Sequence, residues 1–237
     1  MDPAAYIAHL GADSAALLEA HRADPTAPVW PGLGWTRTEL LSHVAKVHTR
    51  TRAQLELGPG ERVRFSSLEP EPEGDDLPDR FEAGVVELLE LLRTMDVSAA
   101  WPTWAGPQPG LFYPRRMAQE MAVHRWDSIG GPIDADLAVD GVDELLELFA
   151  PRLPAERLPD PGGTIHLHAT DVEGEWLINV RPDGITFERG HAKGDVAVRG
   201  EASDLLLWAW NRVPVDERFE VFGDPGLLEA WRTSVVF

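Results

Sequence analysis

The spacing of apolar residues changes near Pro132, and this change constrains the fold more than any other feature of the sequence. Before Pro132, apolar side chains recur at the three- and four-residue spacing of amphipathic helices. After one further helical stretch at about 135–150, short apolar segments follow that are separated by Gly, Pro and Asp turns. Strands grouped with flanking helices are typical of α+β domains. The sequence therefore predicts an α+β protein of two parts, residues 1–134 and 135–237.

Four helices are predicted in the first part. Thr36 and Glu39 have the spacing of a capping box, which marks the start of the second helix. Residues 101–110 are predicted to form a rigid loop, and the acidic, proline-bearing stretch 61–76 an exposed one. The helices are expected over residues 4–22, 37–57, 77–95 and 112–130. Four helices of this length favour a bundle with a site between facing helices.

Short strands and two further helices are predicted in the second part. Arg181-Pro182-Asp183-Gly184 has the composition of a hairpin turn between two of the strands. The strands are expected over 164–169, 176–180, 185–188 and 195–198, and the helices over 201–211 and 224–234. This part is expected to be the smaller, α+β domain.

Composition excludes several classes of function. The 40 acidic and 21 basic residues give a formal charge of −19, which disfavours nucleic acid and anionic membranes as partners. There is no cysteine, so disulfides, cysteine-ligated metals and a protein thiol nucleophile are all ruled out. Neither a secretory signal nor an apolar run of about 18 residues is visible. We expect a cytoplasmic protein, monomeric or homodimeric, whose partners are small molecules.

Three residues from two helices form a candidate metal site. Glu120 and His124 are four residues apart, which places them roughly 40° apart on one helix face. His43 on the second helix can supply another imidazole. Two histidines and one carboxylate, with coordination positions left over, suit Zn²⁺ or a similar ion used in catalysis. Alternatively, His43 is a partly buried structural histidine and Glu120 with His124 an ordinary surface pair.

Other polar residues near this site allow two interpretations each. Asp127 follows His124 by one turn and can orient its free ring nitrogen, or it forms a salt bridge with an arginine. His48 lies about 140° around the helix from His43, so it is expected at the surface, or at the mouth of the site, and not on the metal. Arg115 and Arg116 begin the fourth helix and either bind an anion or are solvated.

The strand histidines and the tryptophans are less specific signals. His166 and His168 alternate on one strand face, a spacing that can bind metal. Without a third ligand nearby in sequence, exposed polar positions are the favoured interpretation. Tryptophans near the metal site can wall an apolar pocket, although core packing accounts for them equally well. These tryptophans are Trp35, Trp101, Trp104 and Trp126.

These motifs together resemble the mycothiol-dependent maleylpyruvate isomerase family of actinobacteria. The matching segments are WTRTELLSHVA at 35–45, RMAQEMAVHRWD at 116–127, GEASDLLLWAWNR at 200–212 and FGD at 222–224. The resemblance spans nearly the whole chain. It implies an N-terminal DinB-like four-helix bundle that binds a metal, followed by a smaller α/β domain of the sterol-carrier kind.

The resemblance also implies a set of functional residues. By position, His43, Glu120 and His124 would be the metal ligands. Arg212 falls where the family often has Gly-Arg and would hold a substrate carboxylate in an inter-domain cleft, although Asn211 here replaces that glycine. The thiol-binding residues cannot be placed.

The implied activity is a metal- and thiol-dependent isomerisation or S-transfer on a small electrophile such as a maleylpyruvate-type acid. Zn²⁺ would be the metal and mycothiol the thiol. A thiolate would add to a cis double bond conjugated to carbonyl groups, and rotation followed by elimination would give the trans isomer. Two alternatives remain open from sequence. One is a non-catalytic metal- or ligand-binding or regulatory module, and the other is a metal-dependent hydrolase.

Overall fold

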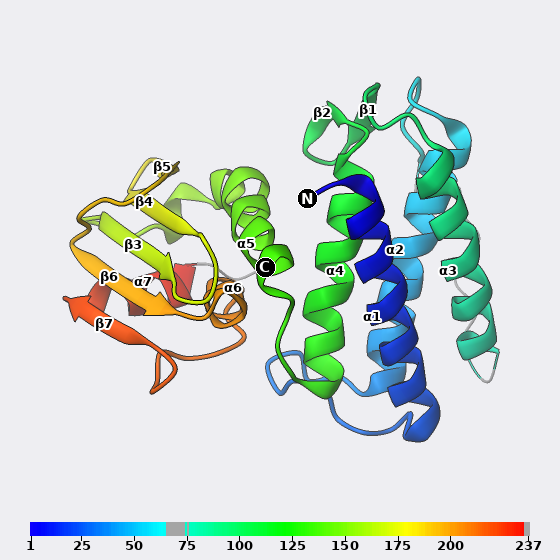
Figure 1. The fold of residues 1–237 in the computed structure, drawn as a ribbon, viewed down its shortest axis with the longest axis horizontal. Coiled ribbons are helices and arrows are strands. Elements are labelled where there is room, and N and C mark those ends of the chain that lie inside the picture. Colours follow the sequence, from blue (N-terminus) through cyan, green and yellow to red (C-terminus); the bar gives the residue numbers. More distant parts are fainter. Residues whose placement is uncertain (65–73, 75, 235–237) are drawn as a thin grey trace. The chain divides into compact units, whose positions relative to one another are not determined.

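The computed structural model describes residues 1–64, 74 and 76–234. Two compact units make up the chain, Met1–Gly131 and Pro132–Phe237. Among the described residues, the first unit contains four helices and one small hairpin, and the second combines helices with a five-stranded sheet (Figure 1). The α+β class predicted from sequence is confirmed. Residues 65–73 and 75 of the predicted acidic loop lie outside the described residues.

The four helices of the first unit begin and end close to their predicted limits. Their bounds are α1 (Pro3–Ala23), α2 (Arg37–Leu57), α3 (Leu77–Thr94) and α4 (Phe112–Ile129). The capping box at the start of α2 is formed, since Thr36 and Glu39 each accept a hydrogen bond from the backbone nitrogen of the other. None of the described helices has both the length and the apolar character that crossing a membrane requires.

Side-chain contacts fix the directions of the helices. Arg22 near the end of α1 pairs with Asp79 and Glu82 at the start of α3, so these two helices are antiparallel. Helices α2 and α4 are also antiparallel, because Thr51 near the end of α2 donates to Met117 near the start of α4. In the core between the helices, Leu10, Leu40, Leu41, Val44, Leu88 and Met121 are fully buried. Burying these side chains stabilises the bundle.

The segment 101–110 was predicted to be a rigid loop, but in the structure it forms most of a two-stranded hairpin. Strands β1 (Ala100–Thr103) and β2 (Gly106–Pro109) are antiparallel, with Pro102 opposite Pro107. An isolated two-stranded ribbon has two outer edges, where a proline loses no ladder hydrogen bond. The carbonyl oxygen of Pro102 accepts a hydrogen bond from the Tyr113 hydroxyl at 2.7 Å, which joins the hairpin to α4. The prolines suggested a loop because their partners across the ladder are not visible in sequence.

His48 is buried and not at the surface, so the sequence expectation for it is wrong. Only 3% of its area is exposed, and its ring stacks on Phe81 at a centroid distance of 5.4 Å. Neither ring nitrogen hydrogen-bonds to any residue that the structure describes. Burial disfavours the imidazolium form and lowers the pKa of His48 to about 4. His48 therefore belongs to the packing between α2 and α3.

This burial predicts a stability that depends on pH. The pKa of His48 in the folded protein lies below its unfolded value of 6.5. The contribution of neutral His48 to the free energy of unfolding is therefore present above pH 6.5 and is lost as pH falls towards 4. Between pH 7 and pH 5, the free energy of unfolding should drop by about 2 kcal/mol more in the native chain than in His48→Leu. Urea unfolding of both proteins at the two pH values measures this difference. An equal drop in both would contradict a neutral, buried His48.

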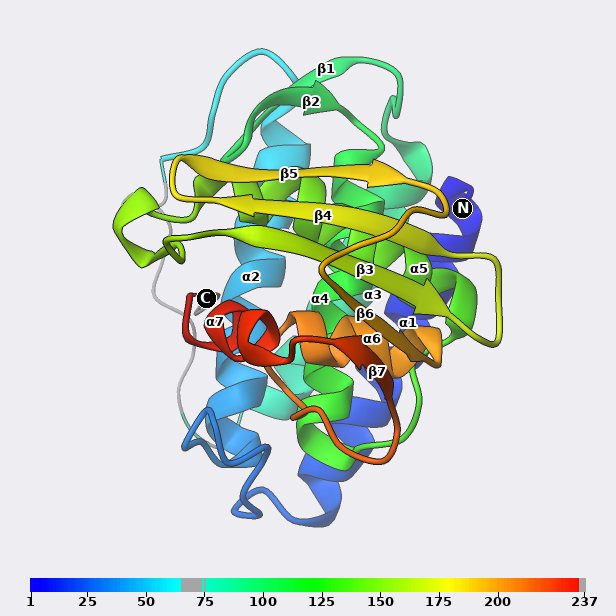
Figure 2. The same cartoon turned by 90° about the vertical axis from the view of Figure 1, so that its left-hand side faces the viewer.

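The second unit is built on a sheet with strand order β5-β4-β3-β6-β7. Its strands are β3 (Gly163–Ala169), β4 (Glu175–Arg181), β5 (Gly184–Arg189), β6 (Val196–Gly200) and β7 (Glu220–Gly223). Only β3 and β6 are parallel, and the other neighbours are antiparallel (Figure 2). The turn predicted at 181–184 joins β4 to β5. Strand β7 was missed because this short edge strand is mostly exposed and has little apolar alternation.

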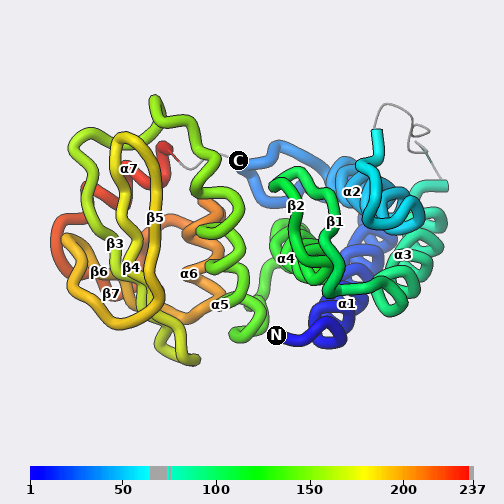
Figure 3. Tube along the Cα trace, turned by 90° about the horizontal axis from the view of Figure 1, so that it is seen from above, coloured from blue at the N-terminus to red at the C-terminus, as the bar shows by residue number. Residues whose placement is uncertain are grey.

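Helices α5 (Ala135–Glu144) and α6 (Ala202–Ala209) pack on one face of this sheet, as Figure 3 shows from above. That face is apolar and includes Ile165, Leu167 and Trp176, all of them fully buried. Helix α5 continues into a π-helical turn at Leu145–Phe149, and α7 (Gly226–Ser234) ends the described chain. The other face of β3 presents His166 and His168. The expectation of exposed positions is wrong for His166, which is only 5% exposed.

Candidate metal centre

The bundle brings together His43, Glu120 and His124, the three residues that the sequence suggested. His43 comes from α2, and the other two lie one turn apart on α4. The Oε1 atom of Glu120 lies 3.3 Å from Nε2 of His43 and 3.3 Å from Nε2 of His124. All three potential ligand atoms lie within 4.8 Å of one another. Because α2 and α4 are antiparallel, His43 in the first half of α2 lies beside the middle and later part of α4, where Glu120 and His124 are.

These three residues fit a divalent metal ion in chemistry and spacing. Two imidazole nitrogens and a carboxylate oxygen are ligands that Zn²⁺ accepts in catalytic sites. In a tetrahedral site with bonds of about 2.0–2.1 Å, neighbouring ligand atoms are roughly 3.3 Å apart. The two distances to Glu120 equal that separation. Three ligands leave at least one coordination position for a small molecule.

Arg116 holds the second oxygen of Glu120. Its Nη2 donates to Oε2 at 2.6 Å, and the arginine side chain is 9% exposed. Burial alone would raise the pKa of Glu120, but His124, His43 and Arg116 lower it well below its usual value. Glu120 is therefore an oriented carboxylate. Arg116 was expected to be either solvated or anion-binding. Its pairing with Glu120, a candidate ligand one turn away, was missed, although the i,i+4 spacing could have suggested it.

Asp127 orients His124 from the side away from the site. Its Oδ2 accepts a hydrogen bond from Nδ1 of His124 at 2.9 Å, and the carboxylate is completely buried. This bond leaves Nε2 of the imidazole directed towards Glu120. Burial lowers the pKa of His124, but Glu120 and Asp127 together outweigh it and raise the pKa to about 9. Of the two roles considered for Asp127, the orienting one is present in the structure.

His43 is the most open of the three residues. Its side chain is 38% exposed, compared with 16% for Glu120 and 11% for His124. The Trp35 ring lies against its imidazole at a centroid distance of 5.2 Å. The site is thus accessible from the His43 side, where Trp35 provides an apolar neighbour.

Two of the other tryptophans considered as walls of the site, Trp101 and Trp104, have different surroundings. The indole nitrogen of Trp101 donates to the carbonyl oxygen of Asp96 at 2.9 Å, and this side chain is buried. Trp104 is 42% exposed and its ring faces Phe112. Both serve the packing around the hairpin.

Arg212 lies in the second unit, three residues after the end of α6. Its Nη1 donates to the carbonyl oxygen of Trp210 at 3.1 Å, and the residue is half-buried. The neighbouring Asn211 adopts a left-handed conformation with φ of 65°, which asparagine tolerates better than most residues. This conformation explains why Asn211 can occupy a position for which glycine would otherwise be favoured.

Comparison with known proteins agrees with both halves of the structure. The model of the mycothiol maleylpyruvate isomerase N-terminal domain matches residues 5–128, and that of the MDMPI C-terminal domain matches residues 136–230. No curated protein matches the chain in sequence.

Two solved structures with similar folds carry related names. A crystal structure of the mycothiol-dependent maleylpyruvate isomerase superimposes with a TM-score of 0.65 at 15% identity, covering 93% of each chain. A point mutant of that enzyme gives a TM-score of 0.65 at 14% identity, covering 90% of each chain. At these identities the likeness shows the fold.

The two domain matches place the chain among thiol-dependent isomerase enzymes. The N-terminal model alone spans more than half of the 237 residues. The chain belongs to the mycothiol maleylpyruvate isomerase family, as the resemblance in its motifs predicted.

The geometry of the centre predicts which residues retain metal. His43→Ala, Glu120→Ala and His124→Ala should each remove about one divalent ion per chain, because three protein ligands leave no redundancy. His48→Leu, which alters the same helix but removes none of the three proposed ligands, is the matched control and should keep its metal. Elemental analysis after gel filtration measures the content. Full retention in the double variant His43→Ala/His124→Ala would exclude this centre.

Proposed function

We propose that this enzyme isomerises a small, electrophilic, maleylpyruvate-type acid with the help of a low-molecular-weight thiol, and that mycothiol is this thiol. The convergence of His43, Glu120 and His124 in a bundle of this family is the observation that supports the proposal most strongly. A divalent ion, Zn²⁺ first among the candidates, would be held by these three side chains. When bound, such an ion supplies positive charge that lowers the pKa of a thiol.

The composition of the chain supports the use of an external thiol. With no cysteine among its 237 residues, the protein cannot supply a sulfur nucleophile itself. The thiol must therefore reach the centre from solution, and the exposed side of His43 offers the approach. Trp35 borders this approach and would contact the apolar part of an incoming molecule.

The surrounding side chains keep the ligands in a defined state. Arg116 occupies one oxygen of Glu120, so the other oxygen is directed to the two imidazoles. Asp127 fixes the ring orientation of His124 through Nδ1. Such supporting hydrogen bonds reduce the reorganisation that the site needs during a reaction.

Arg212 is proposed to bind the carboxylate of the substrate. A guanidinium donates in a fork geometry that matches a carboxylate. In the second unit the residue is half-buried, and the backbone of Trp210 holds one of its nitrogens. A positioned arginine of this kind would bind an anionic substrate in the ground state as well as during the reaction.

Thiol dependence is the central test of the proposed function. With maleylpyruvate as substrate, turnover should rise with mycothiol concentration and then saturate, because the thiol is a bound reactant. Removal of metal with a chelator should abolish turnover, and Zn²⁺ should restore it. Initial rates measured across a thiol series, with intact and chelator-treated enzyme, give both results.

Two outcomes would redirect this interpretation. Turnover that is unchanged when thiol is omitted from fully metallated enzyme would indicate a metal-dependent hydrolase. A metallated protein that binds small ligands but converts no electrophile, with or without thiol, would indicate a binding or regulatory module.

Replacing Arg212 tests the carboxylate contact separately. Arg212→Ala should raise KM for a carboxylate substrate by about 10- to 100-fold, the usual effect of losing a hydrogen bond to a charged group, while metal content stays unchanged. Arg218→Ala is the matched control, since Arg218 is an arginine of the same unit that pairs with Asp216. Normal KM in Arg212→Ala would remove this contact from the proposal but leave the metal centre intact.

A further inference from the structure

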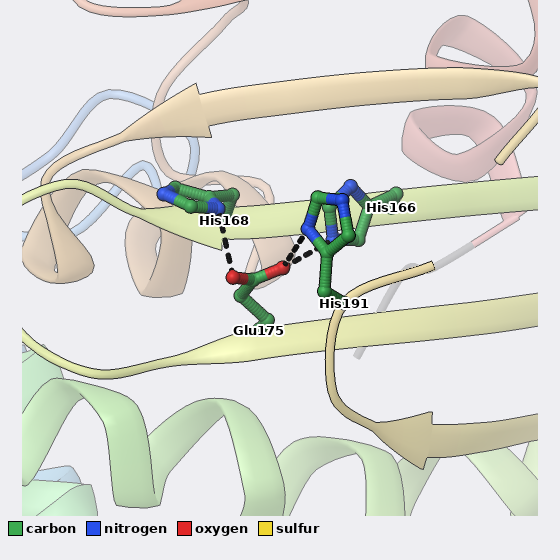
Figure 4. A group of neighbouring side chains, drawn as sticks. All are labelled: His166, His168, Glu175 and His191. Carbon is green, nitrogen blue, oxygen red and sulfur yellow. Dashed lines mark hydrogen bonds and ion pairs between the residues drawn. The ribbon is translucent and has the colours of Figure 1, made fainter. Parts of the chain in front are cut away.

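A second group of metal-ligating side chains lies in the second unit, on a face of the sheet that the proposed function does not use. It consists of His166, His168, Glu175 and His191, drawn in Figure 4. Each of the four offers one ligand atom, and these atoms lie within 4.8 Å of one another. We call this group the sheet cluster.

Strand register assembles the sheet cluster. His166 and His168 alternate with buried apolar residues on β3, so both point to the same face. Glu175 begins β4 and is paired directly with His168 across the ladder. His191 follows β5 and reaches back over the cluster, with its ring perpendicular to that of His166 at a centroid distance of 5.3 Å. Three separate segments therefore meet at one carboxylate.

All three imidazoles are directed at Glu175. Its Oε2 lies 3.0 Å from Nε2 of His166 and 2.8 Å from Nδ1 of His191, and its Oε1 lies 3.2 Å from Nδ1 of His168. Ligand atoms around a tetrahedral zinc ion are roughly 3.3 Å apart, and these three separations lie within about half an ångström of that value. Three imidazole nitrogens and one carboxylate oxygen complete four-fold coordination with protein ligands alone.

The sheet cluster has a buried side, which holds its ligands in place, and an open side, through which an ion can enter. The His166 side chain is only 7% exposed, whereas that of His191 is 80% exposed. A polar hollow lined by His168, Glu175 and His191 connects the ligands with solvent. The net charge of −19 favours the approach of cations. An ion can thus enter from solvent and meet ligands that the strands have already positioned.

We propose that His166, His168, Glu175 and His191 bind one divalent transition-metal ion of the zinc type. Because the protein fills all four positions, this ion has a structural role: it fastens the loop after β5 to the hairpin of β3 and β4. The site is independent of the centre in the helical bundle and requires no thiol or substrate.

Metal binding in a background without the first centre tests this proposal. The full chain, free of any histidine tag, would carry His43→Ala and His124→Ala and would be titrated with Zn²⁺ against a chromophoric chelator. We expect it to bind about one ion. Adding Glu175→Gln or His191→Ala should weaken binding by about 100-fold or more, beyond the 10- to 100-fold that losing a supporting residue costs. Lys193→Ala, an exposed change in the same loop, should have no effect.

Stability provides a second readout. Zn²⁺ should raise the unfolding midpoint of the background variant and should not raise that of the same variant with Glu175→Gln, since only a bound ion stabilises the folded state. The single variant Glu175→Gln should keep its ion at the bundle centre, which shows that the chain is folded. A background variant that binds no ion, or unchanged affinity after both Glu175→Gln and His191→Ala, would overturn the proposal.

Discussion

The buried carboxylate of Glu120 is the interaction on which the helical bundle's site depends. A carboxylate at 16% side-chain exposure is costly unless cations and donors surround it, and here Arg116 and two imidazoles do so. These partners come from both α2 and α4, so the carboxylate fixes the register of the two helices as well as the ligand geometry. A shift of α2 against α4 would take His43 away from the carboxylate, whereas Arg116 and His124, both on α4, would stay beside it. Function and packing are therefore coupled at one residue.

Local signals in the sequence were sufficient for much of this arrangement. The capping box at Thr36 marked the start of α2, and the i,i+4 spacing of Glu120 and His124 placed two candidate ligands on one face. His43 was a candidate because it lies on a second predicted helix, but nothing local in the sequence shows which helix faces α4. The burial of His48 could not be predicted, since it depends on Phe81 from a helix much further along the chain. Contacts between elements are the information that periodicity lacks.

The sheet cluster shows the same limit more clearly. The sequence shows His166 and His168 as an alternating pair, but it does not show a third ligand beside them. Glu175 joins the pair only through the register of β3 with β4. His191 comes from a loop, where no periodicity exists to place a side chain. If the length of the turn between β3 and β4 had been predicted, the strand register would have paired His168 with Glu175. The register of neighbouring strands therefore locates a site that composition alone does not.

The parallel pairing of β3 with β6 has a kinetic consequence. Thr164 and Asp195, which hydrogen-bond beside this pair, are 31 residues apart, whereas the β4–β5 hairpin closes over a tight turn. Pairing of distant segments requires closure of a long loop, and the entropy cost of closure comes before any contact offsets it. We therefore expect the β3–β6 pair to form late in folding. An ion that joins His191 to the β3–β4 hairpin before β6 pairs with β3 would shorten that loop. A bound ion would then lower the entropy cost of closing that loop, in addition to stabilising the folded unit.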